Sequence, residues 1–176
     1  MVSAAAVANF FIDAANKCGA EPMTNLRLQK LMYYAQAWNL IRNGNPLFDE
    51  NIKAWELGPV VPSIYQKYKI CGHNPIANAD DSFDYSVFHE TELSVLIDVF
   101  VGYGKYTTSQ LVNMTHRPKG AWDRTEKNAT ISNECIRADF SGMKPLEGIA
   151  DLVAKIPEEG FHDENGHLVL PADWED

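Results

Sequence analysis

The side chains that could catalyse a reaction or bind a metal are scattered along this chain. Its five histidines are His73, His89, His116, His162 and His167. None stands four residues from another, as paired helical zinc ligands do, and no HExxH motif occurs. Cys71 and His73 are close enough in sequence to act as nucleophile and base, but they fall in a Gly/Asn/Pro segment with no third orienting group. The residue types therefore predict no metal site and favour a non-catalytic role, with a small hydrolase or transferase as an alternative.

Phosphate-binding and redox motifs are also absent from the sequence. Gly102 and Gly104 form a GxG without the third glycine, after a predicted helix rather than a strand. The cysteines Cys18, Cys71 and Cys135 contain no CxxC pair, which indicates reduced thiols rather than a disulfide framework or a zinc site. No secretion signal and no apolar stretch of roughly 20 residues is found. We expect a soluble cytoplasmic protein without a cofactor.

One histidine has a candidate role in binding. His116 follows Thr115 at the end of a predicted helix, where the unpaired carbonyl groups of the last turn favour an imidazolium. Capping of that helix is one interpretation. The other is that His116 contacts a partner in a groove together with Trp122.

Amides and tyrosines are concentrated on the helix that begins near residue 25. Tyr33 and Tyr34 are neighbours and project about 100° apart, so one can reach the surface while the other packs inward. Gln29, Lys30 and Gln36 share or adjoin that surface. Tyrosine and tryptophan dominate the energetics of protein interfaces. We therefore expect an exposed strip of amides and tyrosine that docks a partner, with core packing as the alternative.

A stiff turn follows this helix over residues 55–62. Pro59 and Pro62 restrict its backbone, and Gly58 can adopt conformations that other residues avoid. A rigid turn loses little entropy on binding, which favours an interface. The complete set of predicted partner-binding residues is Gln29, Lys30, Tyr33, Gln36, Trp55, Glu56, Gly58, Pro59, Tyr65, His116 and Trp122.

The elements that must position these residues are mainly helices. Apolar periodicity and capping residues predict helices over about 4–18, 25–42, 62–70, 89–103, 108–117, 133–140 and 145–156. The 25–42 helix is apolar or aromatic on nearly every side in its middle, which predicts a central position. Minor extended pieces are expected at residues 52–55 and in a small hairpin around Asn165-Gly166. The predicted fold is a mainly α, single compact domain of six or seven helices around a central apolar helix.

The formal charge of −9 is concentrated at the C-terminal end. Residues 1–155 carry 15 Lys and Arg against 17 Asp and Glu, whereas residues 156–176 carry seven acids and no Lys or Arg. Neither part has the basic surface that phosphate contacts require, so nucleic-acid binding is disfavoured. We expect a helical domain over residues 1–156 and an acidic tail over residues 157–176, which either meets a basic partner or is simply solvated.

The order of these residues resembles the Panacea domain, the SocA-like antitoxin family also found in phage-associated proteins. The matching stretches are LQKL at 28–31, YYAQAW at 33–38, PLF at 46–48, AWE at 54–56, GPVVP at 58–62, then Tyr65, Thr115-His116 and Trp122. The helix motif and the turn motif at this spacing make a specific match when they occur together. With the other stretches, the resemblance covers roughly residues 24–140. Ala121 stands where the family usually has a proline.

This resemblance implies a type II antitoxin, a mainly helical protein that neutralises a toxin by direct binding. The toxin is expected to be encoded next to it. Partners in the family include toxic small alarmone synthetases and other growth-inhibiting enzymes. At least one branch delivers its toxin to a protease, so a proteolytic adaptor is an alternative. No helix-turn-helix segment is fused here, and neither operator DNA nor a membrane is an expected partner.

Overall fold

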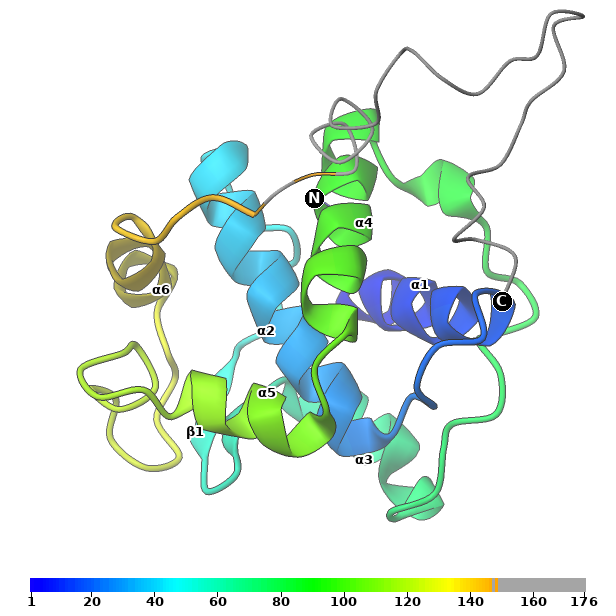
Figure 1. The fold of residues 1–176 in the computed structure, drawn as a ribbon, viewed down its shortest axis with the longest axis horizontal. Helices are drawn as coiled ribbons and strands as arrows, with labels where there is room; N and C mark the ends of the chain where they lie inside the picture. Colours follow the sequence, from blue (N-terminus) through cyan, green and yellow to red (C-terminus); the bar gives the residue numbers. More distant parts are fainter. Residues whose placement is uncertain (147, 149–176) are drawn as a thin grey trace, which may run out of the picture. The chain divides into compact units, whose positions relative to one another are not determined.

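The computed structural model describes residues 1–146 and 148, and this part of the chain is mainly helical (Figure 1). Its α-helices are α1 (Ala4–Lys17), α2 (Asn25–Arg42), α3 (Pro62–Tyr68), α4 (Glu90–Gly104), α5 (Thr108–Thr115) and α6 (Asn133–Phe140). Two short strands, β1 (Lys53–Trp55) and β2 (Gly58–Val60), and two 3₁₀ turns, η1 (Lys69–Cys71) and η2 (Tyr85–Val87), complete the described elements. The predicted mainly α fold is confirmed.

Capping residues fix where these helices begin. The Thr24 side chain accepts a hydrogen bond from the Arg27 N–H at 3.3 Å, and Ser132 caps α6 in the same way through Cys135. Thr107 and Gln110 form a complete capping box at the start of α5. Each cap gives a partner to a backbone N–H that the first turn leaves unpaired, which stabilises the helix by about 1 kcal/mol. These three starts agree with the sequence prediction.

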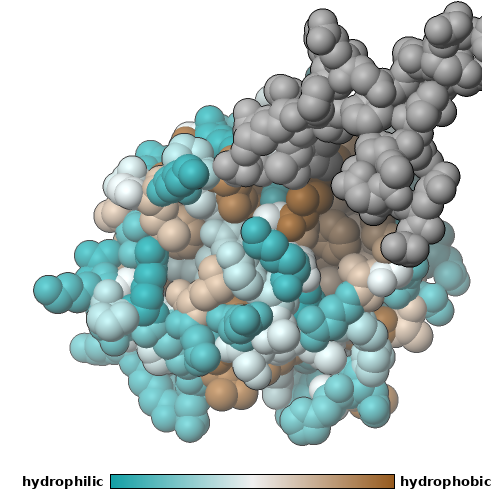
Figure 2. Space-filling view, viewed as in Figure 1, coloured by the Kyte–Doolittle hydropathy of each residue, from teal (hydrophilic) through white to brown (hydrophobic). Residues whose placement is uncertain are grey.

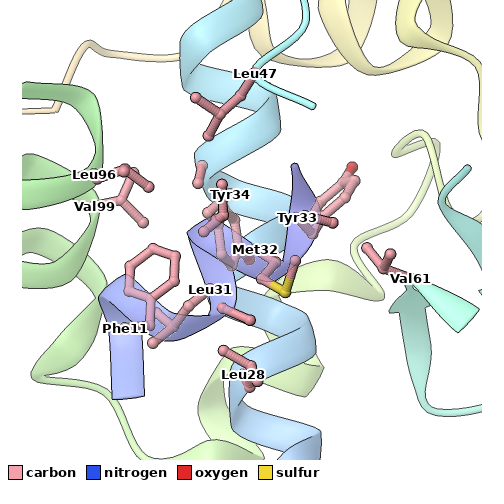
Figure 3. Packing of buried hydrophobic residues seen from close by; sticks show 14 of the residues in the cluster. Phe11, Leu28, Leu31, Met32, Tyr33, Tyr34, Leu47, Val61, Leu96 and Val99 are labelled. Carbon is pink, nitrogen blue, oxygen red and sulfur yellow. The ribbon is translucent and has the colours of Figure 1, made fainter. Parts of the chain in front are cut away.

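Helix α2 lies at the centre of the fold, as its apolar middle predicted. It packs against α1, α3, α4, α5, α6 and β2. Figure 3 shows Leu28 and Leu31 of α2 facing Phe11 of α1, with Leu96 and Val99 of α4 nearby. Burial extends over nearly the whole of α2, including its polar residues. Its buried polar side chains are Asn25, Arg27, Gln29, Lys30, Gln36 and Asn39.

Strands β1 and β2 form an antiparallel hairpin in which Lys53 pairs with Val60 and Trp55 with Gly58. The loop 128–131 lies along the other edge of β1, where the Ala54 N–H donates to the Ala129 carbonyl at 2.9 Å. The extended piece predicted at 52–55 is therefore confirmed. The sequence prediction treated Gly58-Pro59 as a turn only, whereas the structure makes it a second strand because β1 supplies a pairing partner.

Four helices differ by one or two residues from their predicted bounds. Helix α1 ends at Lys17 and α5 at Thr115, one and two residues earlier than expected. The helix expected over 62–70 is α-helical only to Tyr68 and continues as the 3₁₀ turn η1. Helix α4 begins at Glu90 and ends at Gly104, one residue later at each end than expected. The predicted final helix and the predicted hairpin near Asn165-Gly166 lie mainly or wholly outside the described residues. The boundary between a domain over 1–156 and an acidic tail stays a prediction.

The surface of the described part is mixed in character. On the face shown in Figure 2, hydrophilic side chains predominate and apolar ones gather in small groups. Scattered apolar side chains are normal on protein surfaces.

Among residues 1–146 no helix is both long and apolar enough to cross a membrane.

Candidate partner-binding surface

Two consecutive side chains of α2 hold the outer edge of the β-hairpin. The Lys30 Nζ donates to the Pro59 carbonyl at 2.9 Å, and the Gln29 Oε1 accepts from the Val61 N–H at 2.8 Å. Because Ala54 directs its N–H and carbonyl toward the loop 128–131, the opposite residue Pro59 directs its carbonyl toward α2. Gln29 and Lys30 thus take the place of a third strand, and both edges of this small sheet are occupied.

A third polar side chain of α2 holds the turn at residues 46–48. The Gln36 Oε1 accepts from the N–H groups of Leu47 and Phe48 at 2.9 and 3.2 Å. Its Nε2 donates to the Phe48 carbonyl at 3.1 Å and also to the Asn133 side chain. One amide therefore satisfies three buried backbone groups, each of which costs about 1–3 kcal/mol when left unpaired.

These contacts correct the prediction of an exposed amide–tyrosine strip. Gln29, Lys30, Tyr33 and Gln36 are only 1, 0, 3 and 2% exposed. The prediction of exposure is wrong because α2 has neighbours on every side, and the loops around it need partners for their backbone groups. In the free protein Gln29, Lys30 and Gln36 position the hairpin and the turn. Contact of these residues or of Tyr33 with a partner stays a prediction.

Gly58 allows the hairpin to approach α2 closely. Its φ of 103° lies in the region that residues with a side chain rarely adopt. A Cβ atom at this position would lie 2.7 Å from both the Lys30 Nζ and the Thr115 Oγ1. Glycine is therefore required here both by backbone conformation and by space.

Burial perturbs two titratable groups near the hairpin, Lys30 and His116. Lys30 is fully buried, and the loss of solvent lowers its pKa to about 7. Burial also lowers the pKa of His116, and the positive charge of Lys30 lowers it further. The helix end was expected to favour an imidazolium at His116, but burial and Lys30 act against that charge, and this expectation is wrong.

His116 and Trp122 come together as the sequence suggested. Their rings stack with centroids 3.8 Å apart, and the Trp122 Nε1 donates to the Trp55 carbonyl at 2.8 Å. The backbone N–H of His116 also ends α5 by donating to the carbonyls of Val112 and Asn113. The structure therefore brings His116 and Trp122 together, and contact of this pair with a partner stays a prediction. The Trp122 indole thus contacts β1 at Trp55, the residue whose own ring packs on Tyr65.

The tip of the hairpin is the exposed part of the predicted site. Trp55 is half-buried and packs edge-to-face on Tyr65, with centroids 4.9 Å apart. The Glu56 side chain is 82% exposed and Leu57 is 54% exposed. A hollow of about 610 Å³ lies on the Tyr65 side of the tip, and one of about 280 Å³ lies on the Trp122 side. We call Trp55, Glu56, Leu57, Tyr65 and Trp122 the hairpin surface.

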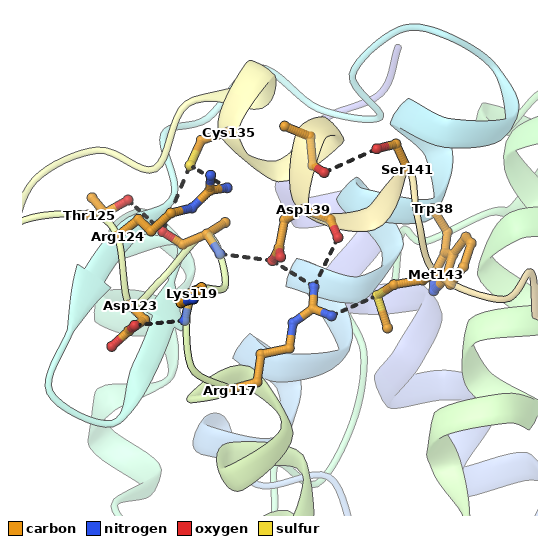
Figure 4. A network of polar contacts seen from close by, with 12 residues as sticks. Trp38, Arg117, Lys119, Asp123, Arg124, Thr125, Cys135, Asp139, Ser141 and Met143 are labelled. Carbon is orange, nitrogen blue, oxygen red and sulfur yellow. Dashed lines mark hydrogen bonds and ion pairs between the residues drawn. The ribbon is translucent and has the colours of Figure 1, made fainter.

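The sequence prediction missed Leu57, although the two-residue turn between β1 and β2 exposes it. It also missed the network that fixes the loop carrying Trp122 (Figure 4). Arg117 forms an ion pair with Asp139 at 2.7 Å, and the Asp139 carboxylate accepts from the Ala121 N–H at 2.8 Å. A proline at position 121 would lack this N–H. No sequence signal could reveal the network, because its members are 18–22 residues apart and no motif joins them.

The described residues bring together no arrangement that suggests catalysis. Cys71 is a free thiol at the end of η1 and His73 is exposed, and within the described part no hydrogen bond joins them. No group of three or more His, Cys, Asp or Glu side chains among residues 1–146 is placed to hold a metal ion. The geometry is that of a stiff, partly aromatic surface on a helical scaffold.

Comparison with known proteins gives the family of this scaffold. The family described as "Antitoxin SocA-like, Panacea domain" matches residues 28–123, from Leu28 in α2 to just past Trp122. The chain belongs to this family of SocA-like antitoxins. Over 131 residues it is 34% identical to Antitoxin SocA of Caulobacter vibrioides (strain NA1000 / CB15N), a match that covers 69% of each chain. No solved structure matches the chain.

Proposed function

We propose that this protein is an antitoxin that neutralises a cognate toxin by direct binding through its hairpin surface. Membership of the SocA-like family supports a toxin as the partner. The protein is proposed to act without catalysis or a cofactor. A cytoplasmic location fits its three free cysteines, since thiols stay reduced there.

One observation carries the proposal: the hairpin is held rigidly from beneath while its tip is exposed. Lys30 and Gln29 fix β2, and the Trp122 indole fixes β1 at Trp55. Glu56 and Leu57 nevertheless reach into solvent. A surface that is already ordered loses little entropy on binding, and aromatic side chains in such surfaces supply most of the binding energy.

Direct blocking and delivery of the toxin to a protease both begin with this binding event. They differ in the half-life of the toxin, which falls only if the protein acts as an adaptor. A small hydrolase or transferase is the remaining alternative. An activity screen with Cys71→Ala and His116→Ala as controls tests it, because activity that these substitutions abolish would contradict a purely binding role.

The test is co-expression of the protein with the product of the neighbouring gene. We expect rescue of growth and co-purification of the two proteins. Leu57→Asp places a charge at the centre of the hairpin surface and is expected to weaken the complex at least about tenfold, since a buried hot-spot contact is worth about 2 kcal/mol. Val87→Asp is the matched control, because Val87 is 51% exposed against 54% for Leu57 and lies in η2.

Both variants should melt at the temperature of the unsubstituted protein, because the altered side chains make few buried contacts. A complex that forms equally well with Leu57→Asp would show that the hairpin surface is not the binding site. If no neighbouring gene product binds the unsubstituted protein, the proposed function is wrong.

A further inference from the structure

A small pocket lies between α2, α4, α5 and α6. Its volume is about 260 Å³. Tyr33 and Tyr34 from α2 line it, together with Tyr103 from α4 and Phe140 from α6. Tyr34 and Tyr103 are stacked with centroids 3.9 Å apart, and the Tyr33 ring meets Phe140 edge-on at 5.9 Å. We call this space the tyrosine pocket.

Soft apolar groups complete its walls. Met114 and Met143 both line the pocket. Thioethers are polarisable and make favourable contacts with aromatic rings, and their flexible chains adapt to the ring that they meet. Four aromatic rings and two thioethers therefore surround a space of the size of one side chain, well below the roughly 300–1,000 Å³ of typical small-molecule sites.

Polar groups within this apolar lining lack partners. Tyr33 and Tyr34 are each only 3% exposed, yet neither hydroxyl has a hydrogen-bond partner among the described residues. The fully enclosed side-chain atoms without a partner in that part of the chain are the Arg27 Nε and the His116 Nε2. The two tyrosine hydroxyls are not among them, so neither is fully enclosed. Burial raises the pKa of each, which keeps the hydroxyls protonated as donors.

Arg117 adds a third polar group that is only partly satisfied. One of its terminal nitrogens pairs with Asp139, but the other donates to the Met143 sulfur at 3.1 Å. A thioether is a weak acceptor, so this N–H is available to a better one. Arg117 also follows His116 directly in the chain, and the His116 ring stacks on Trp122 of the hairpin surface. The tyrosine pocket and the hairpin surface are thereby linked through adjacent residues.

We propose that the tyrosine pocket receives one aromatic side chain with a polar tip, a tyrosine or tryptophan of the toxin. This inference rests on the proposed function and names the chemistry of the anchor residue. The aromatic and thioether walls match a flat ring, and the tyrosine hydroxyls and Arg117 match the hydroxyl or indole N–H at its end. Such residues, buried in a pocket of the partner, are the usual hot spots of protein interfaces.

The pocket can be tested without the toxin by using its own methionines as reporters. The full-length protein is labelled with ¹³C at its methionine methyl groups and titrated with N-acetyl-tyrosinamide or N-acetyl-tryptophanamide. We expect saturable, millimolar binding that shifts the Met114 and Met143 signals through the ring current of the probe. Met23 and Met32 are 1 and 0% exposed and do not line the pocket, so their signals should stay in place. N-acetyl-leucinamide is the matched aliphatic control and should cause no shift.

Conservative variants separate the contribution of the probe's ring to binding from that of its polar tip. Tyr33→Phe and Tyr34→Phe keep the walls and remove one hydroxyl each. They should weaken the tyrosine probe about three- to tenfold while leaving N-acetyl-phenylalaninamide unchanged. Met143→Trp fills the pocket with an indole from the protein itself and should abolish binding of every aromatic probe, with an unchanged melting temperature as the control for folding.

Two results would overturn the inference. One is the absence of any Met114 or Met143 shift up to the solubility limit of the probes. The other is a toxin complex that forms with equal affinity in the Met143→Trp protein, which would leave the proposed function intact. If the unsubstituted protein forms no toxin complex, the proposed function fails instead, so the two failures are distinguishable.

Discussion

Replacement of Lys30 by methionine should remove a pH dependence of stability that this buried group creates. Lys30 is fully enclosed, and its one hydrogen bond among the described residues goes to the Pro59 carbonyl, a neutral acceptor. Its pKa falls from the ordinary 10.5 to about 7 because burial disfavours the charge. Methionine has a similar length and fills the same space, but it neither carries the charge nor donates the hydrogen bond.

The sign of this pH dependence follows from the number of protons bound in the folded and unfolded states. Between pH 7 and 10.5 the unfolded chain keeps the Lys30 proton and the folded protein releases it. The free energy of unfolding therefore rises with pH in this window, by about 1.4 kcal/mol for each pH unit. From pH 7.5 to 9.5 the expected gain is about 2–3 kcal/mol. Below pH 7 the folded state carries the charge and the full penalty remains.

His116 and the buried tyrosines titrate outside this window. His116 has a lowered pKa against an ordinary value of 6.5, so its contribution is complete by pH 7.5. The buried tyrosines, Tyr33 and Tyr34 among them, have pKa values raised above 10.0, so they reduce stability only at higher pH. The interval from pH 7.5 to 9.5 thus separates the effect of Lys30 from those of His116 and these tyrosines, and comparison with the Lys30→Met protein assigns it to Lys30.

The assay is urea unfolding at pH 7.5, 8.5 and 9.5. The Lys30→Met protein should show a nearly constant free energy of unfolding, with stability close to that of the unsubstituted protein at pH 7.5 and lower at pH 9.5. It loses the Pro59 hydrogen bond, which costs about 1–3 kcal/mol, but it escapes the buried charge. Lys127→Met is the control, because the Lys127 side chain is 69% exposed. An unsubstituted protein whose stability does not rise over this range, or a Lys30→Met protein that shows the same rise, would refute the reasoning.

Three further substitutions test how α2 and the hairpin are held together, each by denaturant unfolding. Gly58→Ala should lower the free energy of unfolding by about 2–4 kcal/mol, because the new side chain combines a φ of 103° with a Cβ 2.7 Å from the Lys30 Nζ. Gly142→Ala is the control and should leave the free energy of unfolding nearly unchanged, because the space around Gly142 is open. Gln36→Leu leaves three buried backbone groups unpaired and should cost roughly 3 kcal/mol or more, and a loss below 1 kcal/mol would contradict its role. Arg27→Met removes the donors to the Gly104 and Tyr106 carbonyls and should lower the free energy of unfolding by about 2–4 kcal/mol. Unchanged stability would show that water replaces the lost donors.

Much of the helical framework could be predicted from local patterns. Thr24, Thr107 and Ser132 cap helices through contacts three residues away, and such contacts depend on little beyond sequence spacing. The apolar middle of α2 likewise indicated a central position. The ends of α3 and α4 differ from the prediction, because a helix end depends on what the last turn packs against.

The candidate site was predicted in part. The residue types of Trp55, Tyr65, His116 and Trp122 indicated aromatic contacts, and the structure joins them in one set of contacts around the hairpin. The exposure of Gln29 and Gln36 could not be judged from periodicity, since a polar residue on a helix is usually solvated. Here the groups that they satisfy are backbone atoms of segments 11–32 residues away.

The sequence by itself determined the mainly helical class, the helix starts, the central place of α2 and the family resemblance, because all of these depend on local spacing and on the order of residues. Only the tertiary structure decided which of the polar residues are contacts and which are supports. The physical reason is that a buried backbone N–H or carbonyl must find a partner, and the partner available to the hairpin is the α2 helix beneath it. Gln29, Lys30 and Gln36 are therefore enclosed, and the exposed surface is left to the tip around Glu56 and Leu57.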